Sequence, residues 1–163
     1  KKYNLTPYGT ETMHVLRAEK GFVIVGQETD GTQTPDDLDM NWIVSKKKDD
    51  FIGKRSFSRA DTARDGRHQL VGILADDGSY VIPEGAYIVA GADEKTAPPV
   101  KHIGYITSSY DSAALGRSFA LALVANGLAR KGEKIAIPMA DRVVTGVITD
   151  SVFVDKENTR RDG

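Results

Sequence analysis

The sequence predicts an α+β fold in two parts: a partial α/β (ferredoxin-like) N-terminal piece and a small antiparallel β-barrel or jelly-roll module. Two observations predict this division. Up to about residue 66 the pattern alternates between helices and short apolar strands, and a polar loop then covers residues 64–67. After that loop the apolar residues fall into about seven short runs separated by Gly, Pro and Asp turns, which is typical of a small barrel or sandwich.

The N-terminal piece is expected to hold two helices and two strands. Pro7 suits the first turn of a helix and Gly21 suits its C-terminal end, so residues 8–20 are predicted to be helical. Strands are expected over 22–25 and 40–44, one helical turn over 35–38 with Thr34 as its N-cap, and a second helix over 54–63. Two strands and two helices make a poor independent core. We therefore expect the chain to be the C-terminal part of something larger.

The second module is predicted from short runs with strand-like patterning. These runs are 70–75, 80–82, 86–90, 103–108, 119–124, 133–137 and 143–149. The Asp76-Asp77-Gly78 stretch is a turn signal between the first two.

Composition excludes several classes of function. The formal net charge is -1, from 22 basic and 23 acidic residues, so the sequence predicts neither a nucleic-acid partner nor an anionic membrane partner. There is no cysteine, which excludes disulfides, a thiolate nucleophile and a cysteine zinc site. The lack of cysteine fits a cytoplasmic location, which we expect. No window approaches the roughly 18 apolar residues of a membrane span.

The usual catalytic and cofactor motifs are not found. His14, His68 and His102 have no metal-binding spacing, so we expect no metal site. Asp36 and Asp37 are interpreted as acids favoured by a helix N-terminus rather than as an acid–base pair. No GxGxxG or Walker A loop is present, so this chain is not expected to bind NAD or ATP in the standard ways.

Two features leave a ligand-facing role open. Trp42 on a predicted strand is either a core residue or a ring that stacks on a flat ligand. The polar stretch 107–112 is either a solvated turn or a barrel-rim loop that faces a ligand.

A series of motifs resembles one family. In order they are LRAEKG (16–21), GQETD (26–30), TP (34–35), NWIV (41–44), KKDDFIGKR (47–55), QLVGIL (69–74), HIGYITSSY (102–110) and ALALV (120–124). This order resembles the C-terminal part of the glycine-cleavage aminomethyltransferase family over about residues 3–155. Within the family the chain is most similar to alpha subunits of heterotetrameric sarcosine oxidases. Met13 and Val25 stand where the transferases tend to have an Arg and an aromatic residue, so the transferases' folate contacts are not carried over at those positions.

The resemblance implies a folate module. Residues 1–66 would be the C-terminal piece of a folate-binding subdomain, and residues 67–163 a C-terminal barrel. In the full complex, the imine from sarcosine oxidation would meet tetrahydrofolate and give 5,10-methylenetetrahydrofolate. The resemblance implies that Trp42 walls the folate cavity and that Ser108 and Tyr110 face it. The catalytic Asp is expected upstream, so we expect no catalytic residue in this chain.

The resemblance also implies partners and alternatives. Other sarcosine oxidase subunits would be the protein partners, and FAD, FMN and NAD would be present in the full complex but not bound by this chain. The chain alone is expected to be inactive. The alternatives are a piece of a glycine-cleavage aminomethyltransferase, a piece of a dimethylglycine dehydrogenase, or a non-catalytic module that docks subunits.

Overall fold

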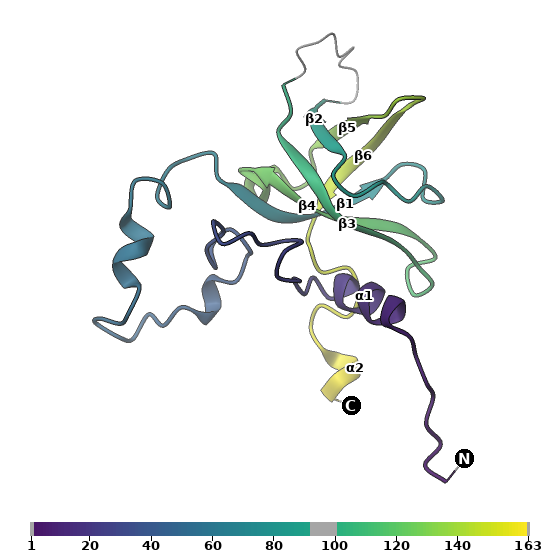
Figure 1. Cartoon of the computed structure of the whole chain (residues 1–163), viewed down its shortest axis with the longest axis horizontal. Helices are drawn as coiled ribbons and strands as arrows, with labels where there is room; N and C mark the ends of the chain where they lie inside the picture. Colours follow the sequence, from purple (N-terminus) through teal and green to yellow (C-terminus); the bar gives the residue numbers. More distant parts are fainter. Residues whose placement is uncertain (1, 92–100, 163) are drawn as a thin grey trace.

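A computed structural model describes residues 2–91 and 101–162 and shows a closed antiparallel barrel beside an N-terminal helix (Figure 1). The α+β class and the antiparallel barrel are thereby confirmed. The N-terminal elements are α1 (Thr10–Glu19) and the 3-10 turns η1 (Asn41–Ile43) and η2 (Lys54–Ser58). The barrel elements are β1 (His68–Ala75), β2 (Tyr87–Ala90), β3 (Gly104–Ser112), β4 (Arg117–Ala125), η3 (Gly127–Arg130), β5 (Lys134–Pro138) and β6 (Val143–Thr149), followed by the short helix α2 (Thr159–Asp162).

The barrel closes in the strand order β1-β4-β3-β2-β5-β6, with β6 pairing back to β1, and every pair is antiparallel. A β-bulge interrupts the β3–β4 register between Ile106 and Ser108. Closure removes the exposed strand edges that would otherwise pair with other chains.

Two apolar clusters stabilise the fold, one on each face of the barrel wall. Alternate residues of β1 and β4, such as Val71 and Ala122, point into the barrel and form the inner cluster. Their neighbours Leu70 and Leu121 point outward and pack with Ala18 of α1. Because this outer cluster covers its outer face, β4 is buried on both sides. This explains why its sequence is a continuous apolar run instead of an alternating one.

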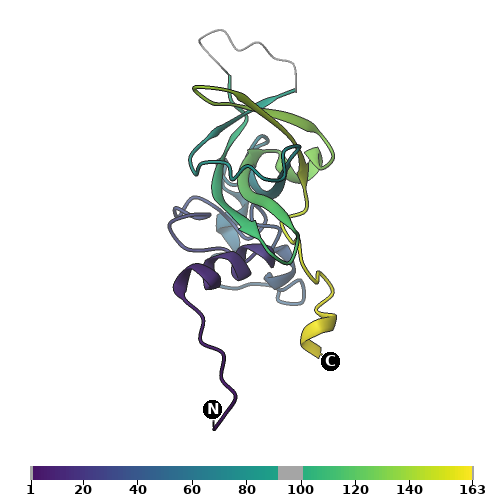
Figure 2. The same cartoon turned by 90° about the vertical axis from the view of Figure 1, so that its right-hand side faces the viewer.

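The C-terminal segment also packs along α1. The backbone N–H groups of Phe153 and Val154 both donate to the carbonyl of Glu19, at 2.9 and 3.0 Å. Both chain ends lie on the α1 side of the barrel (Figure 2). The outer cluster thus holds the N-terminal and C-terminal segments against the same face.

Six of the seven strands expected in the second module are present, and the prediction of a strand over 80–82 is wrong. The carbonyl of Tyr80 accepts a hydrogen bond from the Ser118 hydroxyl at 2.7 Å instead of from a neighbouring strand. Pro83 follows directly and has no N–H to donate to a ladder. Ile82 nevertheless packs in the inner cluster.

Both strands predicted in the N-terminal piece are wrong. Residues 22–24 are irregular and Val25 forms only an isolated bridge, because Gly21 and Gly26 adopt φ of 69° and 98° and the carbonyl of Ile24 accepts two turn hydrogen bonds. Within 40–44 the structure has the 3-10 turn η1, since Ile43 N and Val44 N donate back to Met40 and Asn41. Among the described residues before 68, the only β pairing is an isolated bridge between Val25 and Thr29.

The helix predicted over 54–63 is shorter and tighter than expected. It is the 3-10 turn η2, followed by turns to residue 64. The Thr62 hydroxyl donates to backbone carbonyls of Ser56 and Arg59, which replaces regular helical bonding. By contrast the first predicted helix, 8–20, is confirmed as α1. Figure 1 shows the segment around η2 extending to one side of the barrel.

No helix among the described residues combines the length and apolar character needed to cross a membrane.

Candidate functional site

A cavity of about 960 Å³ lies between the N-terminal loops and the start of β1. Pockets for small organic ligands usually measure about 300–1,000 Å³, so this volume suits such a ligand. The lining combines acids, bases, hydroxyls and two phenyl rings: Thr34, Asp36, Asp37, Asn41, Val44, Ser45, Asp50, Phe51, Lys54, Arg55, Phe57, Ser58, Thr62, Ala63, Arg64, Asp65, Arg67, Gln69 and Asn126.

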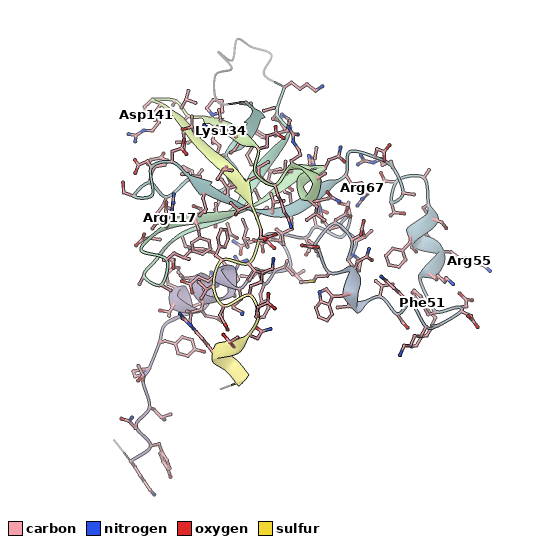
Figure 3. All side chains as sticks on the ribbon, turned by 180° about the vertical axis from the view of Figure 1, so that it is seen from behind. Phe51, Arg55, Arg67, Arg117, Lys134 and Asp141 are labelled. Atoms are coloured by element: carbon pink, nitrogen blue, oxygen red, sulfur yellow. The ribbon has the colours of Figure 1, made fainter. Side chains whose placement is uncertain are left out.

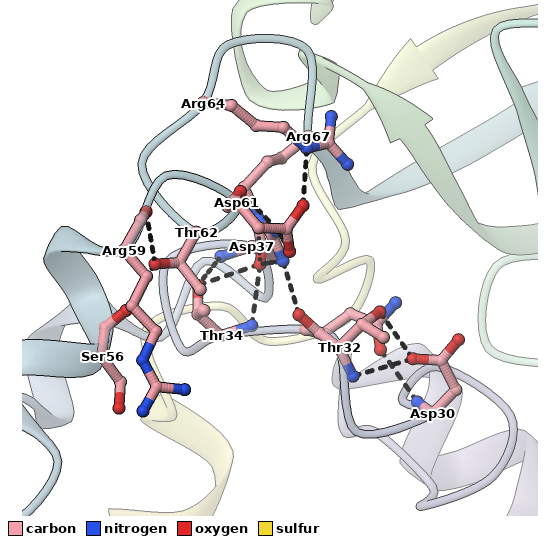
Figure 4. Close-up of polar contacts among 11 residues, drawn as sticks. Asp30, Thr32, Thr34, Asp37, Ser56, Arg59, Asp61, Thr62, Arg64 and Arg67 are labelled. Atoms are coloured by element: carbon pink, nitrogen blue, oxygen red, sulfur yellow. Dashed lines mark hydrogen bonds and ion pairs between the residues drawn. The ribbon is translucent and has the colours of Figure 1, made fainter.

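A buried ion pair between Asp37 and Arg67 lies in the wall of this cavity (Figure 4). Arg67 Nε donates to both carboxylate oxygens of Asp37 at 2.9 and 3.0 Å, and Nη2 donates to Oδ2 at 2.6 Å. Both side chains are nearly inaccessible, with 11% of Arg67 and 2% of Asp37 exposed. The Thr34 N–H and hydroxyl donate to the same carboxylate at 2.7 and 2.9 Å.

Arg67 also connects three segments that are distant in sequence. Its Nη1 donates to the carbonyl and the carboxylate of Asp61 at 3.0 and 3.2 Å, and its Nη2 donates to the Thr32 carbonyl at 2.5 Å. The backbone N–H of Leu70 on β1 donates to the Asp37 carbonyl at 2.7 Å. The loop at 30–37, the turns at 59–63 and the first barrel strand are therefore fixed to one another at this point.

Asp37 and Arg67 each stabilise the charged form of the other. Burial alone would raise the pKa of Asp37, but hydrogen bonds from Arg67 and Thr34 outweigh it and hold that pKa below its ordinary value. The hydrogen bond to Asp37 in turn raises the pKa of Arg67. Both groups are therefore charged at neutral pH, and the cavity wall carries a neutralised pair rather than a free acid.

A second buried cluster joins α1 to β3. Arg17 Nη1 donates to the Glu28 carboxylate at 2.8 Å, and its Nη2 donates to the hydroxyls of Ser108 and Tyr110 at 2.7 and 3.3 Å. The Ser108 hydroxyl donates to the other Glu28 oxygen at 2.5 Å, and Gln27 accepts from Arg17 at 3.0 Å. Glu28 is fully buried, so this pair ties the 22–29 segment to the barrel wall. The Nε of Arg17 is buried without a partner among the described residues.

The three residues predicted to face a ligand are divided between these two regions. Trp42 lies in η1 with 80% of its surface exposed, between Asn41 and Val44, which contribute to the cavity lining. Ser108 and Tyr110 instead bind Arg17 on β3. The structure brings Ser108 and Tyr110 together and does not bring them into contact with Trp42.

Two of the three histidines pack against tyrosine rings. His68 packs edge-on against Tyr105 with ring centres 6.1 Å apart, and His102 packs against Tyr87 at 4.6 Å. Within residues 2–91 and 101–162, no three His, Cys, Asp or Glu side chains gather as a metal site.

Sequence reasoning missed four residues that organise the site. Asp37 was interpreted as a helix-dipole charge, although the Thr34-x-x-Asp37 spacing is that of a capping box and was a usable signal. Arg67 and Arg17 carry no local signal for these contacts, because Arg67 lies 30 residues from Asp37 and Arg17 lies 91 residues from Ser108. Glu28 is in the GQETD motif, but nothing in that motif indicates full burial.

Comparison with known proteins identifies the family. The sequence model of the glycine cleavage T-protein C-terminal barrel domain matches residues 68–155, and that of the GCVT N-terminal domain matches residues 1–48. The sarcosine oxidase subunit alpha of Corynebacterium sp. (strain P-1) is 53% identical over 163 residues, covering 100% of this chain and 17% of that protein. The corresponding subunit of Rhizobium meliloti (strain 1021) is 36% identical, covering 98% of this chain and 16% of that protein.

More distant relatives and a solved structure support the same family. An aminomethyltransferase of Caldanaerobacter subterraneus is 29% identical over 96% of this chain and 39% of its own length. The crystal structure of the glycine cleavage system aminomethyltransferase T from Bartonella henselae matches the fold with a TM-score of 0.70 at 20% identity, over 88% of this chain and 38% of that one. The chain therefore spans less than a fifth of the sarcosine oxidase subunits that it matches. It belongs to the glycine cleavage T-protein C-terminal barrel domain family.

Proposed function

We propose that this chain is the C-terminal part of the folate-binding region of a sarcosine oxidase alpha subunit. There it would help to wall the cavity in which the imine from sarcosine oxidation is transferred to tetrahydrofolate, giving 5,10-methylenetetrahydrofolate. The observation that carries the proposal is 53% identity to such a subunit across all of the chain, together with a cavity of about 960 Å³ at the base of the barrel. Residues 1–66 and 67–163 would be two parts of this folate region.

The residues present fit a ligand with a flat ring system and a polar periphery. Trp42 is not among the residues that line the cavity, but it follows the lining residue Asn41 in the chain and offers an exposed ring, and Phe51 and Phe57 of the lining add apolar surface. The side chains of Asn41 and Asn126, which line the cavity, supply hydrogen-bonding capacity. Proteins usually recognise such ring systems in a preformed, mostly apolar cleft, where a small number of polar groups fix the orientation of the ligand.

Within this proposal Trp42 contacts the ligand directly. Ser108 and Tyr110 remain candidate folate-binding residues, and we assign them the specific role of holding the Arg17 guanidinium in place. An iminium ion hydrolyses in bulk water, so its capture needs a walled site and a positioned amine. This chain would supply walls and orientation, while the catalytic Asp would belong to the upstream part.

FAD, FMN and NAD would bind elsewhere in the complex. The cytoplasmic location is also a proposal, and it rests on the lack of cysteine.

Exposed apolar side chains favour a second candidate function. Large apolar residues are more than 40% exposed throughout the N-terminal piece: Tyr3, Leu5, Tyr8, Met13, Leu16, Phe22, Val25, Trp42, Ile43 and Ile52. Such a surface is typical of protein–protein contact. The chain would then serve chiefly to dock other parts or subunits of the complex, with no ligand in the cavity.

Calorimetry of the intact protein with tetrahydrofolate separates the two functions. The folate role predicts measurable binding, about 2- to 12-fold weaker for Trp42→Ala and nearly unchanged for Trp42→Phe, because the aromatic contact carries about 0.5–1.5 kcal/mol beyond burial. Exposed Val143 on β6 offers a control, since Val143→Ala removes apolar surface outside the cavity lining. No heat with the unmodified protein would overturn the folate role and favour docking. An unchanged affinity for Trp42→Ala would remove Trp42 from the site.

A further inference from the structure

One half of the barrel's outer surface is left outside the outer apolar cluster. That cluster takes residues from β1, β3 and β4, such as Leu70, Tyr110 and Leu121, and among the described residues it includes none from β2, β5 or β6. β5 pairs with both β2 and β6, and the three strands lie on the side of the barrel away from α1 (Figure 1). This half of the wall is therefore open to solvent or to a partner.

The outward-facing residues of β2, β5 and β6 form a surface that we call the open face. Residues such as Ile88 and Val144 point into the inner cluster, so the residues that alternate with them along each strand point outward. Cross-strand pairing joins the outward residues into rows, for example Val89 with Ala136 and Ala136 with Thr145. The open face consists of Tyr87, Val89, Lys134, Ala136, Pro138, Val143, Thr145 and Val147.

The open face is apolar for a surface that points away from the core. The outward side of an antiparallel sheet that faces water is usually polar. Here Lys134 is the single charged member, although 28% of the whole chain is charged. Tyr87 and Val143 are 58% and 55% exposed. An apolar surface of this kind indicates contact with another protein.

A small pocket lies in the open face. It measures about 210 Å³ and is lined by Tyr87, Val89 and Pro138, together with His102 from the segment before β3. The rings of Tyr87 and His102 pack with their centres 4.6 Å apart, so they form one aromatic surface. The volume is below the roughly 300–1,000 Å³ of most sites for small organic ligands. It suits a single side chain, and protein interfaces are usually anchored by a few side chains that fill such pockets.

The charges around the pocket favour an acidic partner. Lys134 lies on the open face and Lys101 directly precedes His102, and both lysines are exposed. Within the described part of the chain, neither side chain forms an ion pair or a hydrogen bond. Figure 3 shows Lys134 and Asp141 at the end of the barrel away from η2. Asp141 pairs with Arg142 at 3.1 Å, so this acid does not neutralise the two lysines.

We propose that the open face binds another protein subunit, which presents an apolar side chain flanked by carboxylates. The side chain would enter the pocket, and the carboxylates would meet Lys101 and Lys134. A second copy of the chain suits the face poorly, because a two-fold contact sets a surface against itself and would bring like charges together. No residue of the open face lines the cavity of about 960 Å³, so the inference does not depend on folate binding.

The test measures how the intact protein releases a partner subunit on dilution, with the masses of the species followed by mass photometry. Tyr87→Ala is expected to raise the Kd for the partner about 5- to 30-fold, which is the usual effect of truncating an anchoring aromatic residue. Tyr87→Phe keeps the ring in the pocket wall and should leave the Kd nearly unchanged.

Lys134→Gln tests the charge without disturbing the core, because this side chain is exposed. Loss of one exposed ion pair should raise the Kd about 1.4- to 5-fold at low salt. The difference should disappear near 1 M salt, where the Debye length is about 3 Å. Asp111→Asn is the control, since it removes an exposed charge on β3 outside the open face, and it should leave the Kd unchanged.

The outcomes distinguish this inference from the proposed function. Unchanged subunit release in both Tyr87→Ala and Lys134→Gln would overturn it, and if circular dichroism shows that Tyr87→Ala is unfolded, Lys134→Gln alone decides. A partner that proves to be a second copy of the same polypeptide would overturn it too, as would an intact protein that is a single polypeptide at every concentration. Tetrahydrofolate binding by Lys134→Gln should match that of the unmodified protein in calorimetry, so each idea can fail without the other.

Discussion

Arg67 and Asp37 form a bidentate ion pair that is almost fully buried, with Nη2–Oδ2 at 2.6 Å and only 2% of the Asp37 side chain exposed. Through it the cavity loop at 30–37 is attached to the residue that precedes β1. A buried pair of this kind contributes little if both partners are replaced together, but removing one partner leaves an uncompensated charge. Replacing only one residue of the pair should therefore cause a large loss in the free energy of unfolding.

Asp37→Ala should destabilise the chain by about 3–5 kcal/mol, because the Arg67 guanidinium would remain buried without its carboxylate. The free energy of unfolding, measured by urea denaturation and followed by circular dichroism, tests this. Arg64→Ala is the matched control, since its ion pair with Asp61 has side chains 53% and 69% exposed. It should cost less than about 1 kcal/mol. Similar losses for the two variants would contradict the assigned importance of the buried pair.

The same pair predicts how stability depends on acid. The pKa of Asp37 in the folded chain is below its ordinary value, while the unfolded value is about 3.9. The stabilisation is thus fully present above the unfolded pKa, and it is lost as pH falls below about 4 and through the folded pKa. Urea midpoints measured between about pH 3 and pH 7 should fall in acid, and the fall should be shallower for Asp37→Asn. Parallel curves for the two proteins would show that other carboxylates are responsible.

Much of the barrel could be predicted from the sequence, because the signals that identify its strands lie within the strands themselves and in the turns beside them. The strand predicted over 143–149 agrees with β6 at both ends, because alternation and flanking turns determine a strand without knowledge of its partners. The N-terminal strands could not be predicted correctly. Residues 22–25 are apolar enough for a strand, but Gly21 and Gly26 on either side adopt positive φ, and in the described part of the chain their β pairing is limited to the isolated bridge between Val25 and Thr29.

The candidate site was less accessible to sequence reasoning. Trp42 was singled out because it is the one Trp in the sequence, and its contact with a ligand stays a prediction. Arg67 was not found, because its role depends on Asp37, Asp61 and Thr32, which come together only once the loops fold onto β1. Long-range pairing of charges has no periodic signature, whereas strands and turns do.

Two adjacent positions on β3 should respond in opposite ways. Ser108→Ala removes a hydroxyl that accepts from Arg17 and donates to the buried Glu28, so it should cost about 1–3 kcal/mol in the free energy of unfolding. Thr107→Val replaces a buried hydroxyl that has no partner among the described residues with a methyl group of the same shape. This change should be neutral or stabilising.

A double-mutant cycle of Ser108→Ala with Glu28→Gln should show coupling of about 0.5–3 kcal/mol. Additive losses would mean that the two side chains do not act together.

Gly104 should be intolerant of any side chain, because β3 and β4 approach closely at this point. A Cβ there would contact the Leu123 carbonyl and would lie 2.8 Å from the Val124 Cα, and backbone atoms of a paired strand cannot move aside independently. Gly104→Ala should therefore cost about 3 kcal/mol or more, at the upper end of the cost of overpacking. For a chain of this size that corresponds to a drop in Tm of roughly 6–12 °C. Asp111→Ala, an exposed position on the same strand, should change the free energy of unfolding by less than about 0.5 kcal/mol. If Gly104→Ala unfolds at the same temperature as the unmodified chain, the strands must be able to separate there, and the close β3–β4 register would be wrong.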